Sequence, residues 1–233
     1  MVDKLPRPNL EPLYTIPEAA SYLAVPESTF RSWVRGRKGQ AGRPVLTSEV
    51  PGPTGAPTIP FVCLAEGMVL AAIRKAGVPL QRIRPALDAL RDEIGIEQAL
   101  ASKRLYTDGA ELIYNYGRQH GESADILNDL VVVRNGQRMF NQIVGDYLQR
   151  VTYGSDGYVS LIRLPEFADT QVDVVADPTR SFGRPIFAKG GAKVEDVLGR
   201  IHAGEEFDAV ADDFGVSVHD IQEALRATST IAA

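Results

Sequence analysis

The strongest constraint on the fold is a pair of short amphipathic segments that flank a break at residues 24–26. Thr15 stands three residues before Glu18, which is the spacing of a capping box, and Pro17 occupies the first turn, where its missing N–H leaves no bond unmade. Pro26 cannot continue this helix, but it can begin another. The second segment carries apolar residues at helical spacing: Phe30, Trp33 and Val34. Two short helices joined by a tight turn predict a helix-turn-helix.

The outward face of the second helix is rich in hydroxyl and guanidinium groups. Its predicted members are Ser28, Thr29, Arg31, Ser32 and Arg35. Five bases and no acid fall between positions 31 and 43, namely Arg31, Arg35, Arg37, Lys38 and Arg43. Such groups suit phosphate oxygens and base edges in a major groove, so we predict that these residues, together with Thr15, bind DNA. The alternative is a solvated basic face on a core helix.

The segment that follows is rich in glycine and proline, as a wing would be. Residues 44–46 and 58–61 are expected to form two strands joined by a loop. Helices are then predicted over residues 64–76 and 80–94. The second of these has one apolar seam, made of Leu80, Ile83, Leu87, Leu90 and Ile94. This seam can serve as internal core or as a dimer contact, and we favour a homodimer.

Residues 14–90 resemble the winged-helix DNA-binding domain of the MerR family. The resemblance is carried by Y-T-I-x-E-x-A over residues 14–20, by Val25, by T-F-R over residues 29–31 and by A-G-V-P-L-Q-R-I over residues 76–83. It implies that this part of the chain binds DNA. The chain departs from the family at Ala24, where glycine is usual, and in a longer wing with more proline.

The spacing of this helix-turn-helix recurs near the C-terminus at a constant offset of 191. Ala20, Ala24, Val25, Phe30 and Trp33 correspond to Ala211, Gly215, Val216, Ile221 and Ala224. Gly215 is expected to take the left-handed turn position, and Ser217 to cap the second helix of the copy. An amphipathic helix over residues 194–203 would complete a three-helix, helix-turn-helix-like unit within residues 177–227.

The second copy has the opposite charge. Residues 194–223 hold nine acids and one base, Arg200. The face that corresponds to the DNA reader offers His219, Asp220, Gln222 and Glu223. Phosphates would be repelled by this balance, so the acidic surface either binds a basic protein or is merely solvated. Our candidates for protein binding are Arg180, Arg184, Asp212, Asp213, Asp220, Glu223 and Arg226.

The middle of the chain is predicted to contain short strands, which makes the expected fold class mainly α, within α+β. The interpretation assigns two strands around an Asp-Gly turn to residues 105–116, a strand to 131–133, a helix to 137–148, a hairpin to 151–164 and a strand to 172–175. A polar stretch near residues 117–125 predicts two domains, 1–120 and 121–233.

No motif for catalysis or for a cofactor is found in the sequence. The single cysteine, Cys63, and the three histidines have no metal-ligand spacing, and neither a phosphate-binding loop nor a nucleophile elbow is present. Adjacent acids such as Glu205 and Glu206 point in different directions on a helix and are better explained as solvated. We therefore expect no enzymatic activity, no cofactor and no metal.

The expected location is a soluble state in the cytoplasm. The first residues lack the apolar core of a signal peptide, and no window approaches the roughly 18 apolar residues of a membrane helix. A single cysteine permits no internal disulfide and is compatible with a reducing compartment.

The tail carries a second resemblance. Asp177-Pro178, S-F-G-R-P-I-F at residues 181–187, the pattern V-x-x-V-L-x-R-I-x-A-G-E and the turn D-F-G-V-S are similar to a small bacterial domain found in type II antitoxins. A MerR-like head joined to this tail resembles a VapB-like antitoxin, of the kind paired with a PIN-domain ribonuclease. The resemblance implies that the chain silences a VapC-type toxin and represses its own operon. Residues 188–191 depart from the Gly-Thr-Arg turn of many members.

Two other functions are weighed against this one. A MerR-like transcription regulator could sense a small molecule through residues 105–190. A nucleoid protein fits poorly with a net charge of −5. The neighbouring gene separates the alternatives, because a PIN-domain reading frame favours an antitoxin and a divergent efflux or biosynthetic gene favours a sensor.

Overall fold

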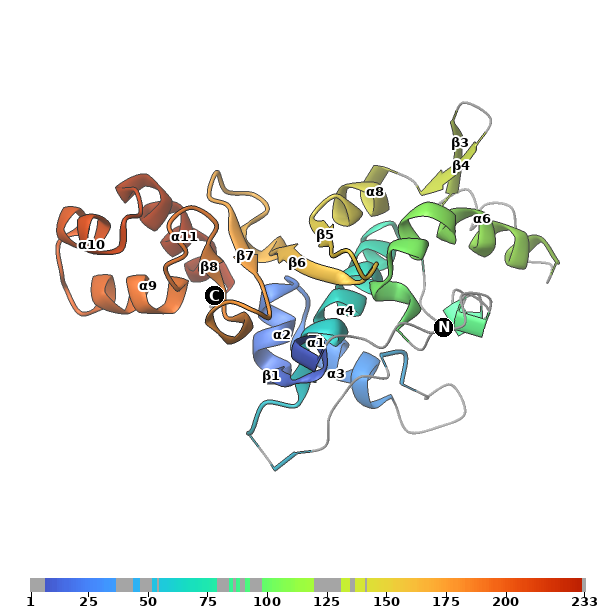
Figure 1. The fold of residues 1–233 in the computed structure, drawn as a ribbon, viewed down its shortest axis with the longest axis horizontal. Coiled ribbons are helices and arrows are strands. Elements are labelled where there is room, and N and C mark those ends of the chain that lie inside the picture. The colour runs from blue at the N-terminus through green and yellow to red at the C-terminus, as the bar shows by residue number, and fades with distance from the viewer. Residues whose placement is uncertain are drawn as a thin grey trace.

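The computed structural model describes residues 7–36, 44–46, 52–53, 55–78, 84–85, 87–88, 91–92, 98–119, 131–134, 137–140 and 142–231. Helices predominate, with short antiparallel sheets between them, which confirms the predicted mainly α, α+β class. In Figure 1 the C-terminal helices form one end of the molecule, and the N-terminal helix-turn-helix lies near its middle.

Helices α2 (Ile16–Tyr22) and α3 (Glu27–Arg35) form the predicted helix-turn-helix. Thr15 is the N-cap of α2, and the Glu18 carboxylate accepts a hydrogen bond from the Thr15 amide at 2.8 Å, which completes the capping box. The predicted inner face is buried: Phe30, Trp33 and Val34. Ala24 makes the turn with a φ of 53°, a left-handed conformation that favours glycine.

The predicted wing has a different strand pairing. Strand β2 (Ile59–Pro60) pairs antiparallel with β1 (Pro12–Tyr14). The prediction of a strand at residues 44–46 is wrong. The amides of the last two of these residues both donate to the carbonyl of Trp33, at 2.8 and 3.0 Å, so this segment satisfies the end of α3 and not a sheet.

Helix α4 (Phe61–Lys75) is the central element of the fold. It begins before the predicted start, so its first residue belongs to the helix and not to the wing. Residues 61–73 are all buried. Gly67 allows the helix-turn-helix to approach closely, because a Cβ there would lie 2.8 Å from a methyl carbon of Leu23 and 2.9 Å from the Phe30 ring.

The helix predicted over residues 80–94 falls largely outside the described residues. Leu87 is described, and it is fully buried within the single chain. The other members of the apolar seam, Leu80, Ile83, Leu90 and Ile94, lie outside the described residues.

Residues 105–116 are helical, so the predicted pair of strands is wrong. After the 3₁₀ turn η1 (Ala99–Ala101), helix α6 (Lys103–Gln119) runs through the Asp-Gly pair that the sequence suggested as a turn. Leu105, Gly109 and Ile113 are spaced by four residues and are buried, which is a helical pattern. Gly109 gives close packing here, since a Cβ would lie 2.8 Å from the Leu105 side chain.

A hairpin of β3 (Val131–Arg134) and β4 (Gln137–Phe140) follows α6. The helix predicted over residues 137–148 is therefore wrong at its start, because residues 137–140 pair with β3 along their whole length. Helix α8 (Gln142–Leu148) accounts for the remainder of the prediction.

A four-stranded antiparallel sheet comes next in the chain. Its strands, in spatial order, are β5 (Val151–Tyr153), β6 (Val159–Arg163), β7 (Val174–Ala176) and β8 (Ile186–Phe187). The predicted hairpin is confirmed as β5 and β6, and the further predicted strand as β7. Short 3₁₀ turns lie after β6 (η2, Pro165–Phe167) and before β8 (η3, Ser181–Gly183).

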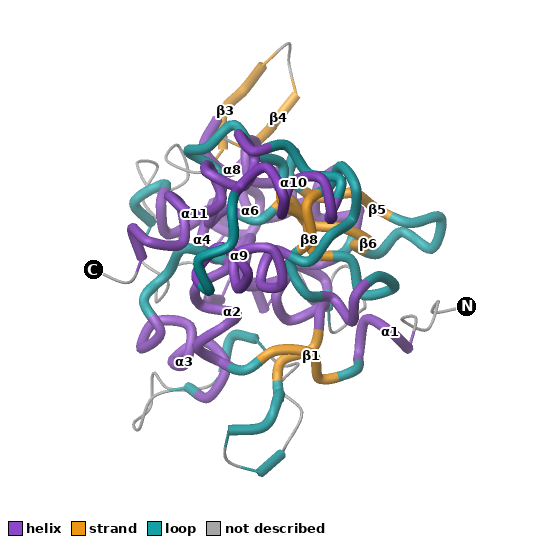
Figure 2. The backbone as a smooth tube through the Cα atoms, turned by 90° about the vertical axis from the view of Figure 1, so that its left-hand side faces the viewer, coloured by secondary structure: helices purple, strands orange, loops and turns teal. Residues whose placement is uncertain are grey.

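The chain ends in the predicted three-helix unit. Helices α9 (Val194–His202), α10 (Phe207–Phe214) and α11 (Val218–Ile231) pack on one another, and α11 also contacts η2. Figure 2 views the molecule from this end and places α3 and the β3–β4 hairpin on opposite sides of it, as Figure 1 does.

One continuous core runs through both predicted domains. Helix α4 packs against α8 and β6, and α2 packs against η2. The predicted boundary at residues 120–121 lies outside the described residues. Among the helices that the structure describes, none has the length and hydropathy that crossing a bilayer requires.

Candidate functional site

The exposed face of α3 is narrower than the sequence predicts. Ser28, Arg31 and Arg35 are exposed, and Ser32 is half-buried. The prediction that Thr29 is exposed is wrong, since only 9% of this residue is accessible. Its Oγ1 accepts a hydrogen bond from Nη1 of Arg74 at 2.8 Å, so it joins α3 to the end of α4.

Arg31 is held on the helix surface by an ion pair with Glu27, one turn earlier. Both side chains are 46% exposed. Solvent screens such pairs strongly, and they are worth little, so the guanidinium can exchange Glu27 for a phosphate at small cost. The serine at position 32 instead uses its hydroxyl to donate to the carbonyl of Thr29 at 2.7 Å.

A hollow of about 520 Å³ lies between α3 and the segment before β2. Arg31 and Arg35 line it on one side, the start of α2 with Thr15 on another, and residues 52–58 in part on a third. Three predicted DNA-binding residues therefore meet at one open depression. Arg37, Lys38 and Arg43 lie outside the described residues.

The C-terminal unit repeats the backbone of this helix-turn-helix. The amide of Val25 donates to the carbonyl of Ala20 at 3.0 Å, and the amide of Val216 donates to that of Ala211 at 3.1 Å. Gly215 has a φ of 63°, so its predicted left-handed conformation is confirmed. The predicted cap is confirmed as well: Ser217 Oγ accepts a hydrogen bond from the Asp220 amide at 3.0 Å.

The surface of the C-terminal unit is acidic, but one predicted member is not on it. Glu223 is 6% exposed, so its assignment to the presented face is wrong. Its carboxylate accepts a hydrogen bond from the Gln171 amide at 3.3 Å and pairs with Arg226. Glu223 thus ties α11 to the loop between η2 and β7.

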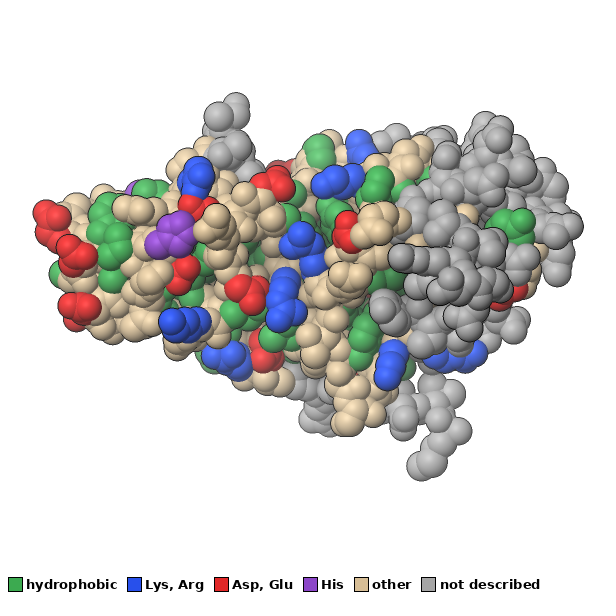
Figure 3. Space-filling view, turned by 90° about the horizontal axis from the view of Figure 1, so that it is seen from above, with side chains coloured by type: hydrophobic (Ala, Val, Ile, Leu, Met, Phe, Trp, Pro, Cys, Tyr) green, Lys and Arg blue, Asp and Glu red, His purple; other side chains and the backbone are tan. Residues whose placement is uncertain are grey.

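The other predicted acids of this unit lie nearer to solvent. Asp212 and Asp213 are exposed, and Asp220 is half-buried. Asp213 shares Arg200 with Glu205, and the hydrogen bond from Arg200 lowers the pKa of the Glu205 carboxyl. Figure 3 shows acidic side chains gathered at this end of the molecule.

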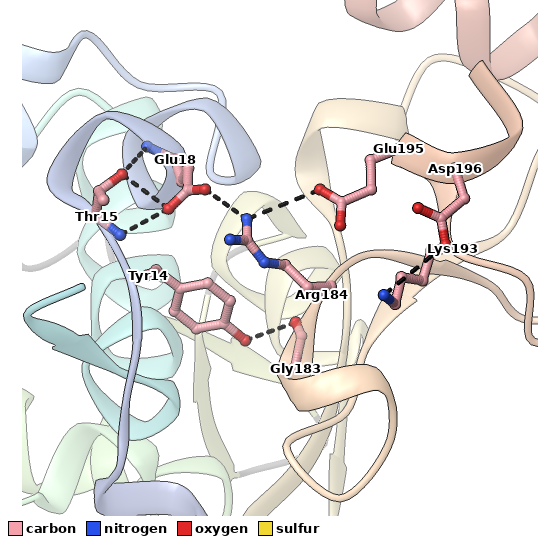
Figure 4. Close-up of polar contacts among 8 residues, drawn as sticks. All are labelled: Tyr14, Thr15, Glu18, Gly183, Arg184, Lys193, Glu195 and Asp196. Atoms are coloured by element: carbon pink, nitrogen blue, oxygen red, sulfur yellow. Dashed lines mark hydrogen bonds and ion pairs between the residues drawn. The ribbon is translucent and has the colours of Figure 1, made fainter. Parts of the chain in front are cut away.

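Arg184 joins the two ends of the chain (Figure 4). Its guanidinium pairs with Glu18 of the α2 capping box, and Nη1 lies 4.0 Å from Glu195 of α9. Burial raises the pKa of the Glu18 carboxyl, but the hydrogen bonds from Thr15 and Arg184 outweigh it, so the net pKa lies below the usual value. Arg184 is a predicted protein-binding residue, and no pattern in the sequence indicates its pairing with Glu18.

A second connection lies beside Arg184. The Tyr14 hydroxyl donates to the carbonyl of Gly183 at 2.8 Å, and burial raises the pKa of this phenol. Burial also raises the pKa of Tyr22 to about 12. These groups stay protonated at neutral pH, so Tyr14 acts as a fixed donor to the turn before β8. Among the described residues no cluster of potential metal ligands is present.

Comparison with known proteins relates both ends of the chain to families. Residues 12–87 match the family described as "Putative DNA-binding HTH domain", and residues 174–226 match the family "Protein of unknown function (DUF433)". These two segments contain the two helix-turn-helix units described above.

Two relatives from Mycobacterium tuberculosis (strain ATCC 25618 / H37Rv) match almost the whole length. The chain is 44% identical over 227 residues to "Putative antitoxin VapB45", with 93% of each chain covered. It is 27% identical over 220 residues to "Uncharacterized protein Rv2308", with 91% of this chain and 88% of that one covered. The crystal structure of Rv2018 from the same species has a TM-score of 0.81 at 44% identity, covering 92% of this chain and 97% of that chain.

Proposed function

The chain belongs to the VapB-like antitoxin family, and we propose that it neutralises a cognate PIN-domain ribonuclease and represses its own operon. The observation that carries this proposal is the presence, in one chain, of two helix-turn-helix units with the same turn and opposite surfaces. One presents arginine and serine, and the other presents carboxylates. Such a molecule can bind DNA with one end and a protein with the other, and it needs no catalytic residue of its own.

The operator contact is assigned to α3. Arg31 and Arg35 line one side of the hollow described above, and Thr15 lies across it. Guanidinium groups on an exposed helix can bind guanine edges or phosphates, and serine hydroxyls can bind either. Because Thr29 is buried and its hydroxyl accepts a hydrogen bond from Arg74 of α4, we expect it to orient α3 and not to touch DNA.

The toxin contact is assigned to the C-terminal unit and the turn before it. Asp212, Asp213 and Asp220 give this end its negative surface, and a nuclease that binds RNA needs positive charge near its active site. Arg180 and Arg226 are exposed at the same end of the chain. The negative surface of this chain would then cover the positively charged active site of the toxin through complementary charge.

We further propose that the repressor is a homodimer. A two-fold symmetric repressor would bind an inverted repeat whose half-sites are separated by whole turns of the duplex. Sedimentation at high micromolar concentration should detect the dimer, and a monomer under those conditions would contradict this part of the proposal.

The experiment that tests the main proposal uses the full chain, because one core joins its two halves. The wild type and an Arg31→Ala/Arg35→Ala variant are each co-expressed with the PIN-domain protein encoded by the neighbouring gene. We expect both to co-purify with the toxin and relieve its toxicity, while only the wild type retards operator DNA. A wild type that neither binds the toxin nor relieves toxicity would contradict the antitoxin function.

A second candidate function is favoured by one cavity. A depression of about 460 Å³ lies beside the turn between α2 and α3, and three bases line it, namely Arg74, Lys75 and Arg150, against two acids, Asp146 and Asp169. A small carboxylate bound there would touch Val25 and Pro26 of the turn, as a ligand-sensing regulator requires. Carboxylate metabolites should then raise the melting temperature of the wild type but not of an Arg150→Ala variant. If no such ligand raises it, the sensor function has no support.

A further inference from the structure

The turn before β8 holds two non-glycine residues in a left-handed conformation. The φ angles are 47° at Ser181, 53° at Phe182 and 71° at Gly183. L-residues disfavour this region because the side chain crowds the backbone, and a bulky aromatic residue is rarely found there. Such a conformation persists only where the surroundings impose it, and such residues cluster at sites that bind ligands.

The consequence of this conformation is an aromatic side chain in solvent. Phe182 is 81% exposed. The other exposed large apolar residues among those that the structure describes are Leu10 at 40% and Ile143 at 38%. Phe182 therefore leaves far more apolar surface in water than either of them, and the disfavoured turn is what keeps it there.

The turn is held by strand β1 and by the first helix of the N-terminal helix-turn-helix. Tyr14 donates its hydroxyl hydrogen bond to Gly183, and Arg184 pairs with Glu18 (Figure 4). Glycine is required at position 183, since a Cβ there would lie 2.5 Å from the Tyr14 hydroxyl oxygen. At the start of the turn, the side chain of Asp177 accepts a hydrogen bond from the Thr179 amide at 2.8 Å. Phe182 is thus presented on a fixed support.

The segment that contains Phe182 differs in charge from the helices that follow it. Residues 178–193 contain four bases and no acid, namely Arg180, Arg184, Lys189 and Lys193. Arg184 is engaged by Glu18, and Lys193 lies 3.8 Å from Asp196. Arg180 and Lys189 are exposed, and neither pairs with an acid among the residues that the structure describes.

We propose that Phe182 is the aromatic anchor by which this chain docks on its toxin, inserting into an apolar pocket that carboxylates surround. The identity of the partner rests on the proposed antitoxin function. The anchor itself rests on the exposure of Phe182 and on Arg180 and Lys189, the exposed cations of the same segment. Aromatic and arginine side chains are enriched among the residues that dominate binding energy. An anchor that is fixed before binding loses little conformational entropy on association.

The test measures the affinity of full-length variants for the purified PIN-domain protein of the neighbouring gene. Phe182→Ala and Phe182→Asn should each weaken binding by about 30-fold or more, as a hot-spot residue does. Asparagine tolerates the left-handed conformation, so equal losses in both variants assign the effect to the ring and not to the backbone. Phe182→Tyr should retain binding.

Two matched controls carry the other exposed apolar residues. Leu10→Ala and Ile143→Ala should bind the toxin within about twofold of the wild type. Operator affinity should be unchanged in every Phe182 variant, because the ring makes few contacts within the chain. Thermal stability should not fall in any of them, and it should rise slightly in Phe182→Asn, because asparagine tolerates the left-handed conformation. Arg180→Glu should slow association at low salt, while Lys103→Glu, a distant exposed cation, should not.

The outcomes separate the anchor from the antitoxin function. A wild type that binds the toxin, with Phe182→Ala binding equally well, overturns the anchor and leaves the antitoxin function standing. A wild type that does not bind the toxin overturns the antitoxin function and, with it, this partner. If Phe182→Ala abolishes self-association of the free chain without changing toxin affinity, a second copy occupies this surface and the proposal is wrong.

Discussion

The two helix-turn-helix units share a backbone and differ in nearly everything outside it. At an offset of 191, the turn residues Ala24 and Gly215 are both left-handed, and the same amide-to-carbonyl bonds close both turns. The first unit contacts the buried helix α4 at Gly67 and Arg74, whereas the second packs on α9 and the loop after η2. The comparison teaches that the turn specifies a fold, while the function depends on which side chains its second helix presents.

The largest expected effects are losses of stability on changing a core residue of either unit. Phe30 and Ile221 occupy equivalent positions, and both are fully buried. Phe30→Ala should cost about 3–5 kcal/mol and Ile221→Ala about 2–5 kcal/mol, because each leaves a cavity. Urea unfolding followed by far-UV circular dichroism measures both. Exposed replacements in the same helices, Ser28→Ala and Gln222→Ala, serve as controls and should change stability by less than about 0.5 kcal/mol.

Changes at the exposed faces of the two second helices should have a smaller effect, on the free energy of DNA binding. Arg31→Ala should weaken operator binding by about 1–3 kcal/mol if the side chain contacts a base edge, or lower the salt slope by about one if it contacts phosphate. The equivalent change in the second unit, Gln222→Ala, should have no effect. Fluorescence anisotropy over a range of salt concentrations tests both. Equal losses in the two variants would mean that the C-terminal unit also contacts DNA.

The residue types at the two turn positions can be exchanged, alanine for glycine in one unit and glycine for alanine in the other. Ala24→Gly should stabilise the chain, because glycine has no Cβ to crowd the left-handed backbone, and Gly215→Ala should destabilise it. Each change should be about 1 kcal/mol. A Cβ at position 215 would meet nothing within 4 Å, so the conformation alone sets its effect. Thermal unfolding that moved in the same direction for both variants would contradict the equivalence of the turns.

The sequence predicted the parts that local rules determine. The capping box at Thr15, the cap at Ser217 and the left-handed Gly215 follow from short-range chemistry, and each is confirmed. The predictions failed where distant residues decide. Thr29 is buried and bonded to Arg74, 45 positions away, and Glu223 is buried and bonded to Gln171, 52 positions away.

The strand prediction in the middle of the chain is wrong for a related reason. The Asp-Gly pair in α6 has the local signature of a turn, yet Gly109 leaves room for the side chain of Leu105, one turn earlier in the same helix, and for the ring of Phe140 in β4. The close approach of a strand to a helix is a tertiary requirement, and a single sequence does not separate a glycine that permits it from a glycine that forms a turn. The exposure of Phe182 has no signal in the sequence, because a large apolar residue is more often buried.

The smallest expected effect concerns how each unit is tied to the rest of the chain. Glu18 lies in the α2 capping box and pairs with Arg184, whereas the equivalent position in α10 is Ala209, and the N-cap of that helix makes no side-chain hydrogen bond. The pKa of Glu18 is lowered in the folded chain, so its contribution to stability is present above the usual carboxyl pKa and is lost as the pH falls through the lowered value. Arg184→Gln should therefore lower the free energy of unfolding by about 0.5–1 kcal/mol at pH 7. The figure is modest because both side chains are 30% exposed. The loss should be nearly zero once the pH is low enough to protonate Glu18 in both proteins.

Arg163→Gln is the matched control. It removes an exposed ion pair with Asp173, and it should change stability less. Urea unfolding at pH 7 and near pH 3 measures the difference, and a loss of stability for Arg184→Gln that is as large in acid as at neutral pH would mean that the arginine acts through packing and not through its charge.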